Sequence, residues 1–188
     1  DIFIEFEEEP IASASIGQVH RAKLDPRRFA FASSGDEENV GSNEPLDVVV
    51  KVRHAGIDRI VETDLDILSG LAQLAEKLDD FKNYQPIAVV EEMSRTMKRE
   101  LDFGREERNL IQFRSLFEND QTVVIPEPIS ALCSARMITM QHISGTSIRK
   151  ISENCPEGVE PSSIAQTGAN LYLKMIFHHG FFHADPHP

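Results

Sequence analysis

The hydrophobic and polar positions along this chain follow two different periods, which together predict a mixed α and β structure. Residues 1–24 predict a strand, a loop of small residues and a second strand. Residues 48–52 form a run of valines interrupted by one lysine, which is typical of a buried strand. We expect two further strands at 122–128 and 135–140, the first of them ended by prolines.

Three later segments carry apolar residues at helical spacing. Residues 57–78 predict a helix with an apolar side made of Ile60, Leu65, Leu68, Leu71, Leu74 and Leu78. Residues 87–117 contain no proline and predict one long helix. Residues 162–179 predict a last helix, ended by Gly180, whose inward side is made of Ile164, Gly168, Leu171, Met175 and Ile176.

A change in composition separates two of the predicted strands. Residues 25–46 are rich in Ser, Gly, Asn and acidic residues, so we expect a flexible surface insert that carries no chemistry. We assign residues 1–140 to an N-terminal lobe with an antiparallel sheet and helices. Residues 141–188 would then form a hinge and the beginning of a helical C-terminal lobe. The predicted fold class is α+β.

Composition excludes several classes of function. The chain has 188 residues, of which 40% are hydrophobic, enough for one core or for two lobes that share a cleft. A net charge of −12 argues against non-specific nucleic-acid binding, which requires a basic surface. Two cysteines fit a reducing compartment and indicate neither a disulfide framework nor a zinc site. No segment has the ~20 consecutive apolar residues needed to span a bilayer.

The lysine within the valine strand is the first candidate for chemistry, because burying an unpaired ammonium is costly. Lys51 is either a phosphate-binding lysine paired with a helix glutamate, or an edge-strand lysine that reaches solvent. Glu106 is the candidate partner, since it shares the apolar face of the predicted helix with Leu110 and Phe113. Glu100 lies about 120° away around such a helix, so one lysine is not expected to bind both glutamates. The alternative is a solvated acidic face.

Two other segments are candidates for kinase-like loops, one near the nucleotide and one that carries a catalytic aspartate. Ala12–Ser15 is a run of small residues that would allow a ligand close to the backbone, although it would be stiffer than a glycine-rich loop. An ordinary turn is the alternative. His183-Ala184-Asp185-Pro186-His187-Pro188 matches the opening of a phosphotransferase catalytic loop, with Asp185 in the position of the aspartate that accepts the hydroxyl proton. Alone, such a short motif is weak.

Taken in order, these segments resemble a known family. "PIASASIGQVHRA", "VVVKV", "RELDFGREERNL" and "GFFHADPHP" together resemble the UbiB-like atypical kinases, the ubiquinone-biosynthesis and quinone-homeostasis kinases of bacteria, mitochondria and plastids. The alanine-rich loop and the H-A-D-P-H-P motif are peculiar to that family. The resemblance runs from about Phe3 to Pro188, apart from one insert, and implies a protein-kinase-like fold.

The resemblance also implies roles for individual residues. Ala12, Ser13, Ala14 and Ser15 would cover the nucleotide, although the family usually has Ala where Ser13 stands. Lys51 would bind the α- and β-phosphates, and Glu106 would orient Lys51. Asp185 would act as the catalytic base or as a carboxylate beside the metal.

Further residues match the hinge and a second acidic motif of the family. Met140 and His142 belong to the adenine-binding hinge, where Gln141 replaces the usual Glu. Glu100 and Asp102 match the E-x-D pair. In the family, this pair faces elements that precede the region matched by this chain, including a lysine in an N-terminal extension. We expect no metal ligands within the chain. They would follow Pro188, so we expect the isolated 188 residues to be inactive.

The function that the resemblance implies is an ATP- or ADP-binding atypical kinase or ATPase that uses Mg²⁺ and supports quinone-lipid biosynthesis. Its expected partners are the nucleotide and, through elements outside this chain, quinone-biosynthesis enzymes or a lipid surface, but no nucleic acid. The expected location is a mitochondrion or plastid, or a bacterial membrane. One alternative is a non-catalytic, nucleotide-gated scaffold or chaperone for lipid-modifying enzymes. Another is a small-molecule kinase, which the alanine-rich loop and the E-x-D pair disfavour.

Overall fold

The computed structural model describes residues 2–25, 44–153 and 155–184. They divide into two compact units: Asp1–Gln112 with Pro126–His142, and Phe113–Ile125 with Ile143–Pro188. Most of the insert expected at 25–46 lies outside the described residues. The two units are described separately below.

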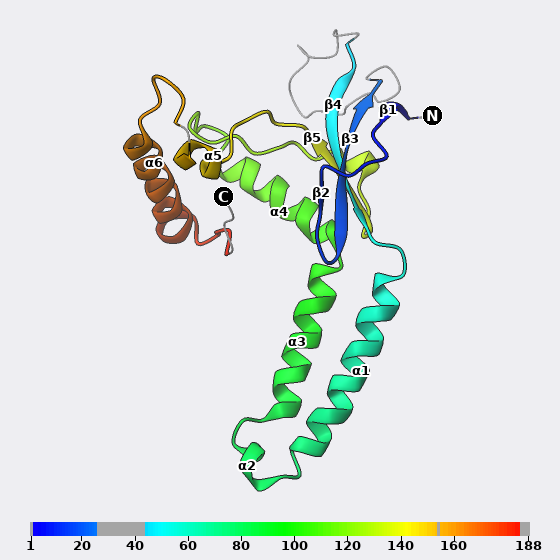
Figure 1. The fold of residues 1–188 in the computed structure, drawn as a ribbon. Coiled ribbons are helices and arrows are strands. Elements are labelled where there is room, and N and C mark those ends of the chain that lie inside the picture. The colour runs from blue at the N-terminus through cyan, green and yellow to red at the C-terminus, as the bar shows by residue number, and fades with distance from the viewer. Residues whose placement is uncertain (1, 26–43, 154, 185–188) are drawn as a thin grey trace. The chain divides into compact units, whose positions relative to one another are not determined.

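An antiparallel sheet forms the centre of the first unit (Figure 1). Its order is β1 (Phe3–Phe6), β3 (Gly17–Leu24), β4 (Leu46–Arg53) and β5 (Met137–Gln141), and the short β2 (Ala12–Ser13) pairs with β3. Val19 faces Lys51 across β3 and β4, and Lys51 faces Ile138 across β4 and β5. The predicted mixed fold with an antiparallel sheet is therefore confirmed.

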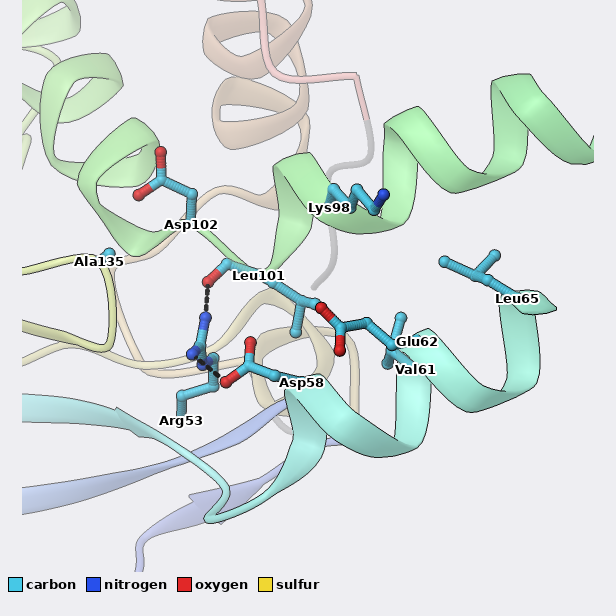
Figure 2. Close-up of a pocket in the computed structure, with 9 residues that line it drawn as sticks. All are labelled: Arg53, Asp58, Val61, Glu62, Leu65, Lys98, Leu101, Asp102 and Ala135. Atoms are coloured by element: carbon cyan, nitrogen blue, oxygen red, sulfur yellow. Dashed lines mark hydrogen bonds and ion pairs between the residues drawn. The ribbon is translucent and has the colours of Figure 1, made fainter.

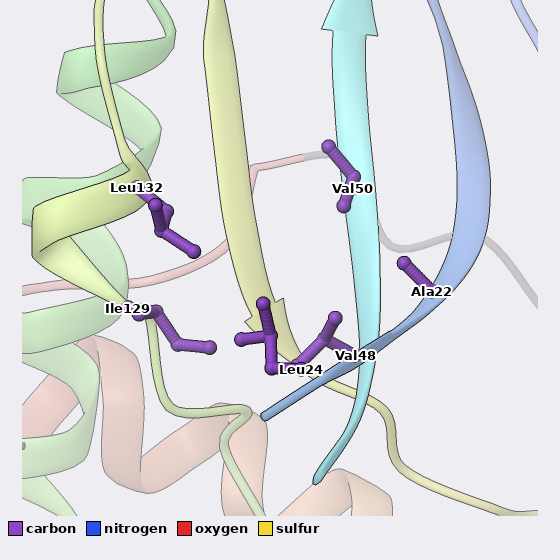
Figure 3. Close-up of a cluster of buried hydrophobic side chains, with 6 residues drawn as sticks. All are labelled: Ala22, Leu24, Val48, Val50, Ile129 and Leu132. Carbon is purple, nitrogen blue, oxygen red and sulfur yellow. The ribbon is translucent and has the colours of Figure 1, made fainter. Parts of the chain in front are cut away.

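One face of the sheet carries the main hydrophobic core (Figure 3). Val48 and Val50 alternate along β4 and are almost completely buried, as is Leu24 on β3. Ile129 and Leu132, from the segment before β5, cover this face, and Ser130–Leu132 forms a short 3₁₀ turn. Each valine or leucine buried in this way contributes about 1.5–3 kcal/mol relative to an exposed one. This alternation leaves the other row of β4 side chains free for polar contacts.

A helical hairpin follows β4 and extends away from the sheet (Figure 1). It consists of α1 (Ile57–Ala75), the short α2 (Asp79–Lys82) and α3 (Pro86–Glu100). Val61 and Leu65 of α1 pack with Leu101 in a second buried cluster. The predicted helix at 57–78 is thus present, but its predicted apolar side is only partly correct. α1 packs against α3, and this contact covers only part of its apolar side. Leu65 is buried and Leu68 half-buried, whereas four others are exposed: Ile60, Leu71, Leu74 and Leu78.

The prediction of one long helix over 87–117 is wrong, because the chain contains two helices there. α3 ends at Glu100, and α4 (Phe103–Leu116) begins three residues later. The backbone N–H of Phe103 donates to the carbonyl of Ala135 at 3.1 Å, so it leaves the helical i to i−4 ladder. The side chain of Asp102 accepts from the N–H of Gly104 at 3.1 Å and caps α4.

The strand predicted at 122–128 is also absent from the structure. Only Pro128 forms an isolated bridge, with Met140 of β5. Pro126 and Pro128 have no backbone N–H to donate, which prevents a regular ladder along this segment. The backbone is satisfied by single bonds instead, such as that from Gln141 N–H to the carbonyl of Glu127 at 2.8 Å. The strand predicted at 135–140 is present as β5.

The second unit is helical in its described part. It contains α5 (Ile148–Glu153) and α6 (Pro161–Leu173), and α6 continues as a π-helical turn over Lys174–His179. Gly180 ends this helix in the left-handed conformation, at φ +61°, and Phe181 N–H donates back to the carbonyl of Met175 at 3.1 Å. The predicted glycine cap is confirmed.

The expected inward side of this last helix is only partly buried. Met175 is buried, Ile164 and Leu171 are half-buried, and Gly168 and Ile176 are exposed. Aromatic contacts supply packing that the helical spacing did not indicate. Phe113 packs on Phe181 with ring centroids 4.6 Å apart, and Phe117 packs on His179 at 5.0 Å. None of the described helices is both long enough and apolar enough to cross a bilayer.

An ion pair ties the last helix to the segment after α4 within the second unit. Lys174 Nζ lies 2.7 Å from Asp120 Oδ2, and this bond, with those from Thr122, lowers the pKa of Asp120 to about 2. A carboxylate whose pKa falls below its unfolded value of 3.8 stabilises the fold above that value. This stabilisation is lost as the pH falls from 3.8 towards 2.

We therefore predict that Lys174→Met lowers the melting temperature at neutral pH. The difference from the wild type should shrink as the pH falls through 3.8 towards about 2, where Asp120 becomes protonated in the folded state. Differential scanning calorimetry across this range measures it. Lys150→Met, at an exposed lysine of α5, is the control and should give no such difference. A Lys174→Met effect that is constant over the acid range would contradict the prediction.

Candidate nucleotide site

The row of β4 side chains opposite the core carries Lys51, and this position decides what the lysine can reach. Because Val48 and Val50 face the core, Lys51 points to the other face of the sheet. Its Nζ lies 2.6 Å from Oε2 of Glu106, which stands in the first turn of α4. The sequence left open a lysine that only reaches solvent, whereas the structure brings Lys51 and Glu106 into contact.

This ion pair is half-exposed. The side chain of Lys51 is 31% exposed and that of Glu106 37% exposed. An ammonium has three N–H donors, so binding one carboxylate oxygen leaves donors for a second anion. Ion pairs with this degree of exposure contribute only about 0–1 kcal/mol to stability. The pair therefore positions a cation near solvent more than it stabilises the fold.

Phe103 contacts the same ammonium and is not among the residues that the sequence pattern singled out. Its ring centroid lies 4.7 Å from Lys51 Nζ, a cation–π distance, and the residue is 3% exposed. Phe103 precedes Glu106 by three residues, so both lie on the same face of α4. That spacing, from an aromatic residue to the candidate glutamate, is the signal that could have identified it.

Gly17 makes room for Phe103 at the beginning of β3. A Cβ atom at this position would lie 2.6 Å from the carbonyl oxygen of Val52 and 3.3 Å from the Phe103 ring. The ring, the start of β3 and the end of β4 thus meet without space for a side chain. Only glycine fits this contact.

The small-residue segment forms β2 with Ala12 and Ser13 and the start of the following turn with Ala14 and Ser15, and all four residues are exposed. Ala12 pairs with Val19, and Ser13 pairs with Gln18. The N–H of Ala14 donates to the carbonyl of Gly17 at 2.9 Å. Nε2 of His54, three residues after Lys51, lies 2.9 Å from the carbonyl of Ala14. The loop is therefore attached to the end of the strand that carries the lysine.

The two hinge residues lie at and just after the end of β5. Met140 pairs with Val49 of β4, and the backbone N–H of His142 donates to the carbonyl of Asp47 at 3.0 Å. Both side chains are half-buried. Their proposed contact with adenine stays a prediction.

The E-x-D pair occupies the junction between α3 and α4. Glu100 is the last residue of α3 and is exposed, while Asp102 caps α4 through the N–H of Gly104. Asp102 Oδ2 also accepts from Arg108 at 3.4 Å. Asp102 lines an open cavity of about 200 Å³ at the base of the hairpin, and Lys51 is not among the residues that line it (Figure 2).

Asp185 lies outside the described residues, so its place relative to Lys51 stays a prediction. The described part of this segment ends at Ala184, and the carbonyl of His183 accepts a hydrogen bond from the hydroxyl of Tyr172. Within residues 2–25, 44–153 and 155–184, no three His, Cys, Asp or Glu side chains are grouped so that they could hold a metal ion.

These features together define a class. An antiparallel sheet, a lysine in the strand before the helices and a helix glutamate bound to it form the N-terminal lobe of a protein-kinase-like fold. A structural comparison agrees: the chain matches the Rv3197–erythromycin complex from Mycobacterium tuberculosis with a TM-score of 0.72 and 23% identity, over 100% of this chain and 42% of that one. At this identity, the match shows the fold alone.

Sequence comparison adds the family. The ABC1 atypical kinase-like domain matches residues 1–31 and 37–188. A probable protein kinase UbiB from Glaesserella parasuis serovar 5 is 33% identical over 99% of this chain and 32% of its own length. The UbiB of Pasteurella multocida is also 33% identical, over 99% of this chain and 34% of its own. The chain belongs to the ABC1 atypical kinase-like family, as the resemblance to UbiB-like kinases predicted. It spans about a third of the length of these curated relatives, which are bacterial.

We predict that Gly17→Ala destabilises the first unit by about 1–3 kcal/mol, because the added methyl group meets the Val52 carbonyl and the Phe103 ring. Gly70→Ala on α1 is the matched control, since nothing lies within 4 Å of the new methyl group. It should stabilise the protein by about 0.5–1 kcal/mol through helix propensity. Urea unfolding measures both changes, and equal effects of the two substitutions would contradict the packing described here.

Proposed function

We propose that this chain provides the nucleotide-binding lobe of an atypical kinase or ATPase that binds ATP or ADP and supports quinone-lipid biosynthesis. The observation that carries the proposal is the ion pair between Lys51 and Glu106, 2.6 Å long and open to solvent. Kinases use such a pair to hold the α- and β-phosphates. The quinone-lipid assignment rests on the resemblance to the UbiB-like family.

In this proposal, each part of the site has one task. Lys51 binds the α- and β-phosphates with the N–H donors that Glu106 does not use. Glu106 and the ring of Phe103 hold the ammonium in place from two sides. Ala12–Ser15 covers the phosphates, and Met140 and His142 border the adenine. Asp185 is proposed as the catalytic base or as a carboxylate beside the metal.

Mg²⁺ is expected with the nucleotide, because phosphoryl transfer depends on metal charge and on positioning. The described residues offer no group of ligands for it. From the resemblance to the UbiB-like family, we propose that residues after Pro188 supply ligands for this ion, and we derive no step through it. The same proposal includes partners, which are quinone-biosynthesis enzymes or a lipid surface. It also includes a location, which is a mitochondrion, a plastid or a bacterial membrane.

The test is nucleotide binding by the full-length protein and its Lys51→Met variant, measured by calorimetric titration with ADP and ATP, with and without Mg²⁺. We expect affinity to fall at least about tenfold, since charge-assisted hydrogen bonds to phosphate are lost. The melting temperature without nucleotide should change little, because the ion pair is half-exposed.

Lys82→Met is the matched control. Lys82 also pairs with a carboxylate at 2.7 Å, that of Asp79, but on the short helix α2. Its loss should leave nucleotide affinity unchanged. Equal affinities of the wild type and Lys51→Met would refute the nucleotide site.

The proposed role in quinone-lipid biosynthesis has its own test. Cells that depend on this protein would carry either the wild type or Lys51→Met, and their quinone content would be measured by mass spectrometry. We expect a loss of quinone with Lys51→Met and not with Lys82→Met. Two results together would contradict the kinase or ATPase assignment. The full-length protein would bind nucleotide without hydrolysing it, and cells that carry Lys51→Met would keep normal quinone levels.

A further inference from the structure

Arg53 occupies the same face of β4 as Lys51, two residues further along the strand. Its side chain is 9% exposed, yet it carries a full positive charge. Nη1 donates to the carbonyl of Leu101 at 2.5 Å, and Nη2 donates to Oδ2 of Asp58 at 2.5 Å (Figure 2). One guanidinium thus joins the strand to the end of α3 and to the first turn of α1.

The carbonyl that Arg53 binds lies at the C-terminal end of a helix. Leu101 is the residue directly after α3, where carbonyl groups have no partner within the helix. Two residues later, the N–H of Phe103 donates to the carbonyl of Ala135. These two bonds hold the chain on either side of Asp102 and thereby fix where α4 begins. Glu106 stands in the first turn of α4, so its position depends on both bonds.

The charge of Arg53 is balanced from the hairpin side. Asp58 is the acidic residue in the first turn of α1, and it also lies 4.0 Å from Arg136. A nearly buried guanidinium needs a partner, since leaving it unpaired is strongly destabilising. The cavity of about 200 Å³ borders Arg53 and Asp58, so the guanidinium has room to move once its carboxylate is gone.

We propose that Arg53 is a positioning residue for the pair of Lys51 and Glu106. It acts through the carbonyl of Leu101 and the start of α4, and it does not touch the nucleotide. Asp58 keeps Arg53 in place, so the base of the helical hairpin contributes to nucleotide affinity. This inference rests on the proposed nucleotide binding by Lys51.

The first test is a double-mutant cycle on ADP affinity in the full-length protein. Arg53→Gln should weaken binding about five- to tenfold, whereas the same substitution in a Glu106→Gln background should have no further effect. Arg53→Lys, which keeps the positive charge but not the planar fork that binds both acceptors, should recover part of the loss. Arg95→Gln is the matched control, because Arg95 is exposed and pairs only locally with Glu92 on α3. If the double variant lost ADP affinity by the product of the two single-variant factors, the two residues would act independently and the proposal would be overturned.

The second test observes the ion pair directly and needs no nucleotide. Nitrogen-15 NMR of lysine side chains should show a protected Lys51 ammonium in the wild type and in Arg95→Gln, and its loss in Arg53→Gln. A Lys51 signal that is unchanged in Arg53→Gln would also overturn the proposal. If Arg53→Gln does not fold, Asp58→Asn replaces it in both tests. Suppose that Lys51→Met does not change ADP affinity, while Arg53→Gln still removes the protected Lys51 signal. That result would refute the nucleotide site and leave the positioning role of Arg53 standing.

Discussion

Strand β4 has to bury one row of its side chains, and the candidate site of the first unit depends on that constraint. Val48 and Val50 face the core, so Lys51 and Arg53 must lie on the other face. Two cations two residues apart then contact the helices beyond: Arg53 at the end of α3, and Lys51 in the first turn of α4. The core packing of the sheet and the geometry of the candidate site are thus set by the same alternation.

The break between α3 and α4 is where this constraint has its largest effect. The apolar spacing favours one continuous helix, yet tertiary hydrogen bonds to Arg53 and from Phe103, together with the cap by Asp102, interrupt it. The interruption turns Phe103 and Glu106 towards Lys51. Without it, the helix that carries Glu106 would continue along the direction of α3. A local cost in helix continuity is therefore offset by a charged contact and a buried aromatic ring.

Much of the fold and the centre of the candidate site could be predicted from the sequence. A lysine within a valine strand needs a partner, and Glu106 lies on the apolar face of a helix pattern, so their pairing could be inferred from local periodicity and the cost of burying charge. The glycine cap at Gly180 followed from the same kind of local rule. Phe103 and Arg53 could not be found in this way, because neither a phenylalanine in a helix nor an arginine in a strand is unusual by itself.

What the sequence by itself determined is the mixed α and β fold, the strand that carries Lys51 and the family to which the chain belongs, because these depend on periodicity and on residue order. Only the tertiary structure decided where the long helical segment breaks. It also decided which leucines of α1 are buried. The physical reason is that the helix break and the burial of the α1 leucines depend on partners far away in the chain, Arg53 for the break and α3 for the leucines. The missing strand follows from the prolines, whose effect on the ladder outweighs the β-branched residues beside them.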